Sequence, residues 1–143
     1  MPAEKTILLV DDNVVQAAIR QTILKRAGYF VVTALDPTRA LEMLVEDHFP
    51  SEIELVITDH VMPGMSGTKF VSELRTHFPK LPVLVITGMQ EAGDQYLGLD
   101  VTFRVKPLPP EQLLECVRAM LLDPQPSQIP SSEGSGEIIQ AAR

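Results

Sequence analysis

Short, mostly apolar runs alternate along the chain with longer stretches whose apolar residues recur every three or four positions. The apolar runs span residues 6–10, 29–33, 53–58, 82–86 and 101–105. Helical periodicity covers residues 14–27, 37–46, 68–77 and 110–122, and more weakly residues 90–97. Strands that are apolar on both sides are typical of a buried parallel sheet. Strict alternation without a hairpin signal therefore predicts an α/β fold, a doubly wound five-stranded parallel sheet with five helices.

Residues that begin and end helices mark several of these boundaries. Asp12 or Asn13 is expected to cap the first helix, and Gly28 to end it. Asp36 followed by proline is a similar start signal for the second helix. The last helix follows Leu108-Pro109-Pro110, so its N-cap lacks a side-chain acceptor and is expected to be weaker by roughly 1 kcal/mol. Two glycines in residues 90–98 predict a short or irregular fourth helix.

The apolar face of the first helix is expected to follow a helical repeat. Its predicted positions are Val14, Ala17, Ala18, Ile23, Leu24 and Ala27.

Composition divides the 143 residues into a domain over residues 1–122 and a tail over residues 123–143. The tail is rich in Pro, Ser, Gln and Gly, as linkers are. No apolar run approaches the roughly 18 residues of a membrane span, and the N-terminus lacks a signal-peptide pattern. The lone Cys116 excludes an internal disulfide and a Cys-x-x-Cys redox pair. A cytoplasmic protein without a membrane partner is expected.

The charge balance argues against nucleic acid as a direct partner. Twelve Lys and Arg against 19 Asp and Glu give a net charge of −7. Proteins that bind nucleic acids neutralise phosphates with clustered basic side chains. The densest basic group here is only Arg20, Lys25 and Arg26.

Polar side chains follow four of the five predicted strands at the point where each strand ends. They are Asp11, Asp12, Asp59, Thr87 and Lys106. In open parallel sheets, ligands bind beyond the carboxyl ends of the strands, so these residues are expected to share one pocket. Read singly, Asp11, Asp12 and Asn13 would merely cap a helix, but that reading does not explain the other strand ends.

Three carboxylates in one pocket repel each other unless a cation neutralises them, and hard oxygen ligands suit Mg²⁺. Lys106 adds a positive charge and Thr87 a hydroxyl, which together would hold a phosphoryl group. An Asp carboxylate can itself be the nucleophile. The predicted chemistry is Mg²⁺-assisted phosphoryl transfer onto an Asp.

Four segments, in the right order, resemble the receiver domain of two-component response regulators. They are Ile7-Leu-Leu-Val-Asp-Asp-Asn13, Val56-Ile-Thr-Asp-His-Val-Met-Pro-Gly-Met-Ser-Gly67, Val83-Leu-Val-Ile-Thr-Gly88 and Phe103-Arg-Val-Lys-Pro107. The resemblance covers about residues 5–122 and implies a flavodoxin-like sheet of strand order 2-1-3-4-5.

The resemblance also implies the metal site. Asp59 would be the phospho-acceptor and, with Asp12, a direct ligand of Mg²⁺. The backbone carbonyl of Val61 would be a third protein ligand, and Asp11 would hold the ion through water.

Further roles follow from the same likeness. Lys106 would pair with the phosphoryl oxygens, and its bond to Pro107 is typically cis in the family. Thr87 would move to hydrogen-bond the phosphoryl group, and Phe103 stands where the family has a rotating switch aromatic. His60, beside the acceptor, is expected to face solvent or to tune access, because neighbours on an extended segment point opposite ways.

These roles imply a phosphorelay switch with self-catalysed phosphotransfer and slow autodephosphorylation, and not a turnover enzyme. The implied donor is a histidine kinase or a histidine phosphotransfer domain. The output would be a downstream protein partner or a fused domain, and a homodimer is possible for the fold.

Several alternatives stay open. The chain would be a stand-alone regulator, or a receiver excised from a hybrid sensor kinase or longer regulator. It would otherwise be a docking module that acts without phosphorylation. A Mg²⁺-dependent phosphohydrolase normally needs a second Asp two residues after the nucleophile, where this chain has Val61. Neither glycine-rich nucleotide-binding motif occurs.

Overall fold

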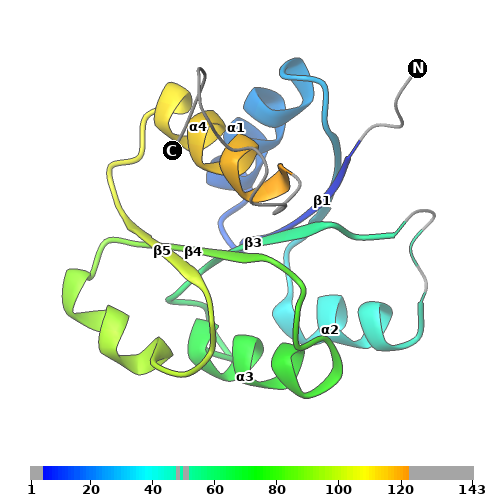
Figure 1. Ribbon diagram of the computed structural model, residues 1–143, viewed down its shortest axis with the longest axis vertical. Helices are drawn as coiled ribbons and strands as arrows, with labels where there is room; N and C mark the ends of the chain where they lie inside the picture. Colours follow the sequence, from blue (N-terminus) through cyan, green and yellow to red (C-terminus); the bar gives the residue numbers. More distant parts are fainter. Residues whose placement is uncertain (1–4, 48, 50–51, 123–143) are drawn as a thin grey trace, which may run out of the picture.

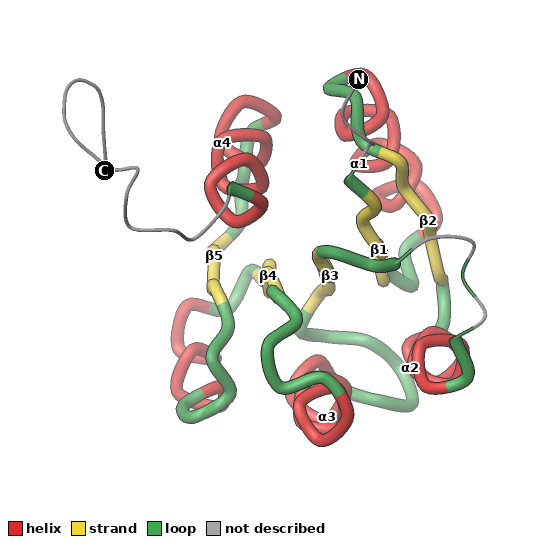
Figure 2. Tube along the Cα trace, turned by 45° about the vertical axis from the view of Figure 1, so that its right-hand side comes forward, coloured by secondary structure: helices red, strands yellow, loops and turns green. Residues whose placement is uncertain are grey.

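The computed structural model describes residues 5–47, 49 and 52–122, and the predicted tail over 123–143 lies outside the described residues. Its strands are β1 (Thr6–Val10), β2 (Phe30–Ala34), β3 (Leu55–Asp59), β4 (Val83–Thr87) and β5 (Thr102–Val105). They form one parallel sheet in the order β2-β1-β3-β4-β5. Figure 2 shows this row of strands between two layers of helices. The predicted doubly wound sheet and its strand order are confirmed.

The helices lie on both faces of the sheet (Figure 1). They are α1 (Val14–Arg26), α2 (Pro37–Val45), α3 (Gly67–His77), α4 (Pro110–Leu121) and the 3₁₀ helix η1 (Gln90–Tyr96). The α1 and α4 helices cover one face, and α2, α3 and η1 cover the other. None of the helices in the described part of the chain has the length and hydropathy of a membrane span.

The prediction of five helices is not met as such, because the described residues form four α-helices, and the predicted short or irregular fourth helix is the 3₁₀ segment between β4 and β5. This segment has only seven residues and no side-chain cap at its start. It contains Gly93 and is followed by Gly98, which has a φ of +84°. A short, uncapped, glycine-containing segment favours the tighter 3₁₀ turn over a regular α-helix.

The central strands are apolar throughout because alternate side chains enter two separate cores. In β1, Leu8 and Val10 pack with α2 and α3, whereas Ile7 and Leu9 pack with α1 and α4. All five residues of β1, β3 and β4 are buried. These strands are therefore rigid supports for whatever follows their carboxyl ends.

The predicted helix ends agree with the structure. Asn13 caps α1 by accepting a hydrogen bond from the Gln16 amide at 2.9 Å, and Gly28 has a φ of +103° just after the helix. Asp36 caps α2 in the same way. Pro109, at the N-cap of α4, supplies no side-chain hydrogen bond, as predicted.

The predicted apolar face of α1 is partly wrong. Val14, Ala18 and Ala27 are exposed, Ile23 is half-buried, and the buried positions are Ala17, Arg20 and Leu24. The helix thus turns Arg20 toward the sheet. A charged side chain is unusual at a buried position unless it is paired with an opposite charge. The pairing partners belong to the site described below.

Arg75, in the last turn of α3, ties together two loops near the amino-terminal edge of the sheet. Its guanidinium donates to the carbonyls of Phe78 and Leu81 at 2.9 and 2.7 Å. It also donates to Leu99 at 2.7 Å and Asp100 at 2.8 Å, in the segment between η1 and β5. One side chain thus satisfies four backbone acceptors from two loops.

Arg75→Ala should lower the free energy of unfolding by about 2–3 kcal/mol, because it removes charged donors from four backbone carbonyls, three of them half-buried. Arg39→Ala is the matched control, since Arg39 is exposed and makes a 3.3 Å surface pair with Glu42 worth less than about 1 kcal/mol. Urea unfolding followed by circular dichroism measures both. Equal losses in the two variants would contradict this role of Arg75.

Candidate functional site

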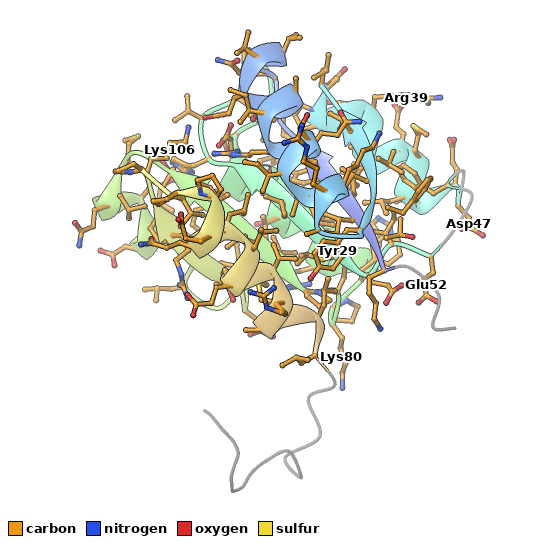
Figure 3. All side chains as sticks on the ribbon, turned by 90° about the horizontal axis from the view of Figure 1, so that it is seen from above. Tyr29, Arg39, Asp47, Glu52, Lys80 and Lys106 are labelled. Atoms are coloured by element: carbon orange, nitrogen blue, oxygen red, sulfur yellow. The ribbon has the colours of Figure 1, made fainter. Side chains whose placement is uncertain are left out.

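The strand register brings the candidate residues to one edge of the sheet. Val10 pairs with Thr58, so Asp11 lies beside Asp59. Asp59 pairs with Ile86, the residue before Thr87. Thr87 pairs with Val105, and the Lys106 amide donates to the Thr87 carbonyl at 2.7 Å. Figure 3 shows Lys106 at the end of the sheet opposite Lys80, which precedes β4.

Three carboxylates meet at this edge, as predicted. Ligand oxygens of Asp11, Asp12 and Asp59 all lie within 4.8 Å of one another. Asp11 is 0% exposed and Asp59 5% exposed, and Asp12 is the most open of the three. Lys106 Nζ lies 3.5 Å from Asp59 Oδ1. Residues at the ends of β1, β3 and β5 therefore form an acidic cluster that is buried at Asp11 and Asp59, open at Asp12 and bordered by Lys106.

The cluster also includes two residues of α1, Arg20 and Gln16, that the sequence analysis did not predict there. Arg20 Nη1 lies 3.3 Å from both Asp11 Oδ2 and Asp59 Oδ1. Gln16 Nε2 donates to Asp11 Oδ2 and Asp59 Oδ2, each at 2.8 Å. One signal is present in the sequence: Arg20 lies three residues after Ala17 and four before Leu24, on their face of the helix. A cation at such a position requires anionic partners.

Burial raises the pKa of Asp59 to about 6, because the charged form is poorly solvated there. The contact with Asp11 contributes to this rise, whereas Arg20 and Lys106 lower the pKa, and the value of about 6 is the net result. The carboxylate that would act as nucleophile is thus partly protonated in mildly acidic solution. Its ionisation depends on the cations around it.

The remaining predicted residues lie around this cluster. Thr87 is buried, and its hydroxyl accepts a hydrogen bond from the Met89 amide at 3.1 Å. Phe103 is half-buried and packs on Tyr96 of η1, with ring centroids 5.8 Å apart. The Lys106–Pro107 peptide is cis, as the resemblance implied. The side chain of Val61 is exposed, and the metal-binding role of its carbonyl stays a prediction.

The expectation that His60 faces solvent is wrong. It is 6% exposed, and a 2.6 Å hydrogen bond joins its Nδ1 to the Tyr96 hydroxyl. The chain turns directly after β3, and the Gly67 amide donates to the His60 carbonyl at 2.7 Å. Alternation along β3 places His60 on the same face as Val56, and η1 covers that face, so the imidazole meets Tyr96 instead of solvent. The loop that follows Asp59 is consequently fixed to the 3₁₀ segment.

The chain matches the family described as "Response regulator receiver domain" over residues 7–118. It is 31% identical over 140 residues to the probable transcriptional regulator ycf27 of Cyanophora paradoxa, covering 96% of this chain and 56% of that one. It is 30% identical over 142 residues to the alkaline phosphatase synthesis transcriptional regulatory protein PhoP of Bacillus subtilis, covering 94% and 58%. This chain thus spans somewhat more than half of each relative.

Solved structures agree with the sequence match. The chemotaxis protein CheY4 of Vibrio cholerae has a TM-score of 0.74 at 30% identity, covering 83% of this chain and 100% of that one. The response regulator TrrA of Thermotoga maritima, solved in complex with Mg(2+)-BeF, has a TM-score of 0.73 at 27% identity, covering 82% and 99%. The chain therefore belongs to the response regulator receiver domains of two-component systems.

The raised pKa of Asp59 makes the stability of the metal-free protein depend on pH. Between the ordinary value of 3.8 and about 6, the native state binds more protons than the unfolded state. The free energy of unfolding should therefore fall as pH rises through this window, by about 2–3 kcal/mol relative to Asp59→Asn. Urea unfolding in a chelator at pH 4 to 7 measures the difference. Parallel curves for the two proteins would show that Asp59 does not titrate in this range.

Gly67 is required by close packing behind Asp59. A Cβ at this position would lie 2.7 Å from the Asp59 carbonyl oxygen and 2.8 Å from His60 Cα. We expect Gly67→Ala to lower the free energy of unfolding by about 1–3 kcal/mol through overpacking. Gly88→Ala, whose Cβ would meet nothing within 4 Å, should change it by less than about 1 kcal/mol. Thermal or urea unfolding measures the change in both variants. An equally small change in Gly67→Ala would show that the loop can shift to accommodate a Cβ and would contradict this role of Gly67.

Proposed function

We propose that this receiver accepts a phosphoryl group from a phosphohistidine onto Asp59 in a Mg²⁺-dependent reaction. The observation that carries the proposal is the placement of Asp59, buried at the end of β3 with two further carboxylates and Lys106 around it. An acidic nucleophile surrounded by charged groups on rigid strands has the parts that phosphoryl transfer needs. The donor would be a histidine kinase or a histidine phosphotransfer domain.

The donor set fits Mg²⁺. An ion with oxygen ligands at about 2.1 Å holds those ligands no more than about 4.2 Å apart, and a water between the ion and one carboxylate relaxes this limit. The 4.8 Å spread among Asp11, Asp12 and Asp59 agrees with two direct ligands and one ligand through water. Asp12 and Asp59 would be the direct ligands, with the Val61 carbonyl, and Asp11 the water-mediated one. TrrA, a similar receiver solved with Mg(2+)-BeF, supports this choice of ion.

The reaction would exchange one bond to phosphorus for another. An Asp59 oxygen would attack the phosphorus, and the nitrogen–phosphorus bond of the phosphohistidine would break with its electron pair remaining on the imidazole. Lys106, already 3.5 Å from Asp59, would pair with the phosphoryl oxygens. The Thr87 hydroxyl would move from the Met89 amide to the same group. Bound Mg²⁺ would supply positive charge that stabilises these oxygens in the transition state.

The output would follow from the added charge. The phosphoryl group would bias a pre-existing equilibrium on the β4–β5 side, where Thr87 and the half-buried Phe103 lie. Attack of water on the phosphorus would later release phosphate and restore the carboxylate, giving a slow reset. A downstream protein or a fused domain in a cytoplasmic setting would read the change. The transcriptional regulators that this chain matches are longer than it is, so a fused output domain is one form of that proposal.

Incubation with Mg²⁺ and a small acyl phosphate should add one phosphoryl group to the protein, because the receiver would itself catalyse the transfer onto Asp59 without a kinase. Intact-protein mass spectrometry measures the gain. Asp59→Asn should abolish the gain, and a chelator should suppress it in the unchanged protein.

Asp47→Asn is the matched control, because it removes an exposed carboxylate at a positive φ of 58° that Asn also adopts. This variant should be phosphorylated as the unchanged protein is. Modification that persists in Asp59→Asn would mean a different acceptor. Absence of modification despite bound Mg²⁺ would favour a docking module that acts without phosphorylation.

A further inference from the structure

The donors that α1 places in the acidic site occupy the oxygens that a metal ion would need. Asp59 Oδ2 accepts from Gln16, and Asp59 Oδ1 faces Arg20 and Lys106. Asp11 Oδ2 accepts from both Gln16 and Arg20, and Asp11 Oδ1 accepts from the Asn13 amide. Every carboxylate oxygen of Asp11 and Asp59 therefore has a protein donor or cation against it.

Arg20 is suited to this position by its shape and its burial. It is 8% exposed, and its Nη1 lies 3.3 Å from one oxygen of each carboxylate, so that a single nitrogen bridges the two. A guanidinium is always charged and is more weakly hydrated than an ammonium, which lowers the penalty of burying it. The side chain thus supplies at this point the positive charge that three clustered carboxylates require.

We propose that Arg20, assisted by Gln16, is a built-in counterion that competes with Mg²⁺ for Asp11 and Asp59. The inference rests on the magnesium site of the proposed function and adds a means of setting its affinity. The guanidinium holds the Asp59 carboxylate that would ligate the ion directly and the Asp11 carboxylate that would hold it through water, and the two positive charges would repel each other. Binding of Mg²⁺ therefore requires Arg20 to leave the carboxylates, and the free energy of breaking its ion pairs with them weakens the metal affinity.

The competition has two measurable consequences that do not depend on phosphorylation. Removing the guanidinium should tighten Mg²⁺ binding. It should also destabilise the metal-free protein, because the buried carboxylates lose their counterion, and Mg²⁺ should then restore more stability than it does in the unchanged protein. If Arg20 served only to pack α1 against the sheet, its substitution would lower stability without tightening Mg²⁺ binding.

The test is calorimetric titration of the full chain with MgCl₂ at 0.1 M salt. Arg20→Met keeps the length of the side chain and removes its charge, and it should tighten Mg²⁺ binding by about tenfold or more. Arg26→Met is the matched control on the same helix, where Arg26 is exposed and about 9 Å further along the axis. It should leave the Mg²⁺ dissociation constant within about twofold, because salt screens charge at that range.

A second variant keeps the test decisive if Arg20→Met does not fold without metal. Arg20→Lys retains the charge but not the planar fork, so it should tighten Mg²⁺ binding by less than Arg20→Met and by more than Arg26→Met. Thermal unfolding with and without MgCl₂, on the same samples, should show the largest metal-induced rise in Tm for the Arg20 variant that binds the ion most tightly.

The outcomes separate this inference from the proposed function. Unchanged or weaker Mg²⁺ binding in both Arg20 variants, with binding lost in Asp12→Asn, would overturn the competition and leave the metal site standing. Absence of Mg²⁺ binding in every protein, or binding that survives Asp12→Asn unchanged, would overturn both. Tighter binding in the Arg20 variants alone, abolished by adding Asp12→Asn, would establish the competition.

Discussion

Mutual repulsion among three carboxylates at one edge of the sheet is the constraint on which the rest of the site depends. The register of β1 against β3 places Asp11 beside Asp59, and no local rearrangement can separate them without breaking the buried sheet. Compensating charge has to come from outside these two strands. It comes from α1 through Arg20 and from the end of β5 through Lys106. The doubly wound fold brings both to the same edge.

The same repulsion determines how the acceptor behaves. Burial and Asp11 raise the pKa of Asp59, while Arg20 and Lys106 oppose that rise, so the charge on the acceptor reflects a balance among its neighbours. Any cation that enters or leaves shifts this balance. Such dependence matters for the proposed reaction, because a carboxylate is a nucleophile only when it is ionised.

Much of the fold follows from patterns within short segments, and the unpredicted parts depend on contacts between segments. The apolar runs identify the strands because both faces of this sheet are buried, and Asn13, Gly28 and Asp36 mark helix ends by local geometry. The gathering of Asp11, Asp59 and Lys106 follows from the strand ends and the topology. The spacing of Arg20 from Ala17 and Leu24 places it on the buried face of α1, but its anionic partners come from β1 and β3 and are not visible within the helix segment. The prediction for His60 is wrong because the face of the sheet to which strand alternation directs it is covered by η1, and is not open to solvent.

The turn after β3 also connects the loop that follows Asp59 to the β5 edge of the sheet. His60 hydrogen-bonds Tyr96 at 2.6 Å, and Tyr96 packs on Phe103 of β5. Gly67 leaves no room for a side chain between this tyrosine and the backbone of the acceptor loop. A shift of the loop after β3 must therefore repack Tyr96, since close-packed contacts of this kind do not deform continuously. The element that bears Tyr96 is a seven-residue 3₁₀ helix without a side-chain cap, so it yields more readily than the strands on either side. The irregular segment between β4 and β5 is in this sense the part of the fold best placed to respond to a change at Asp59.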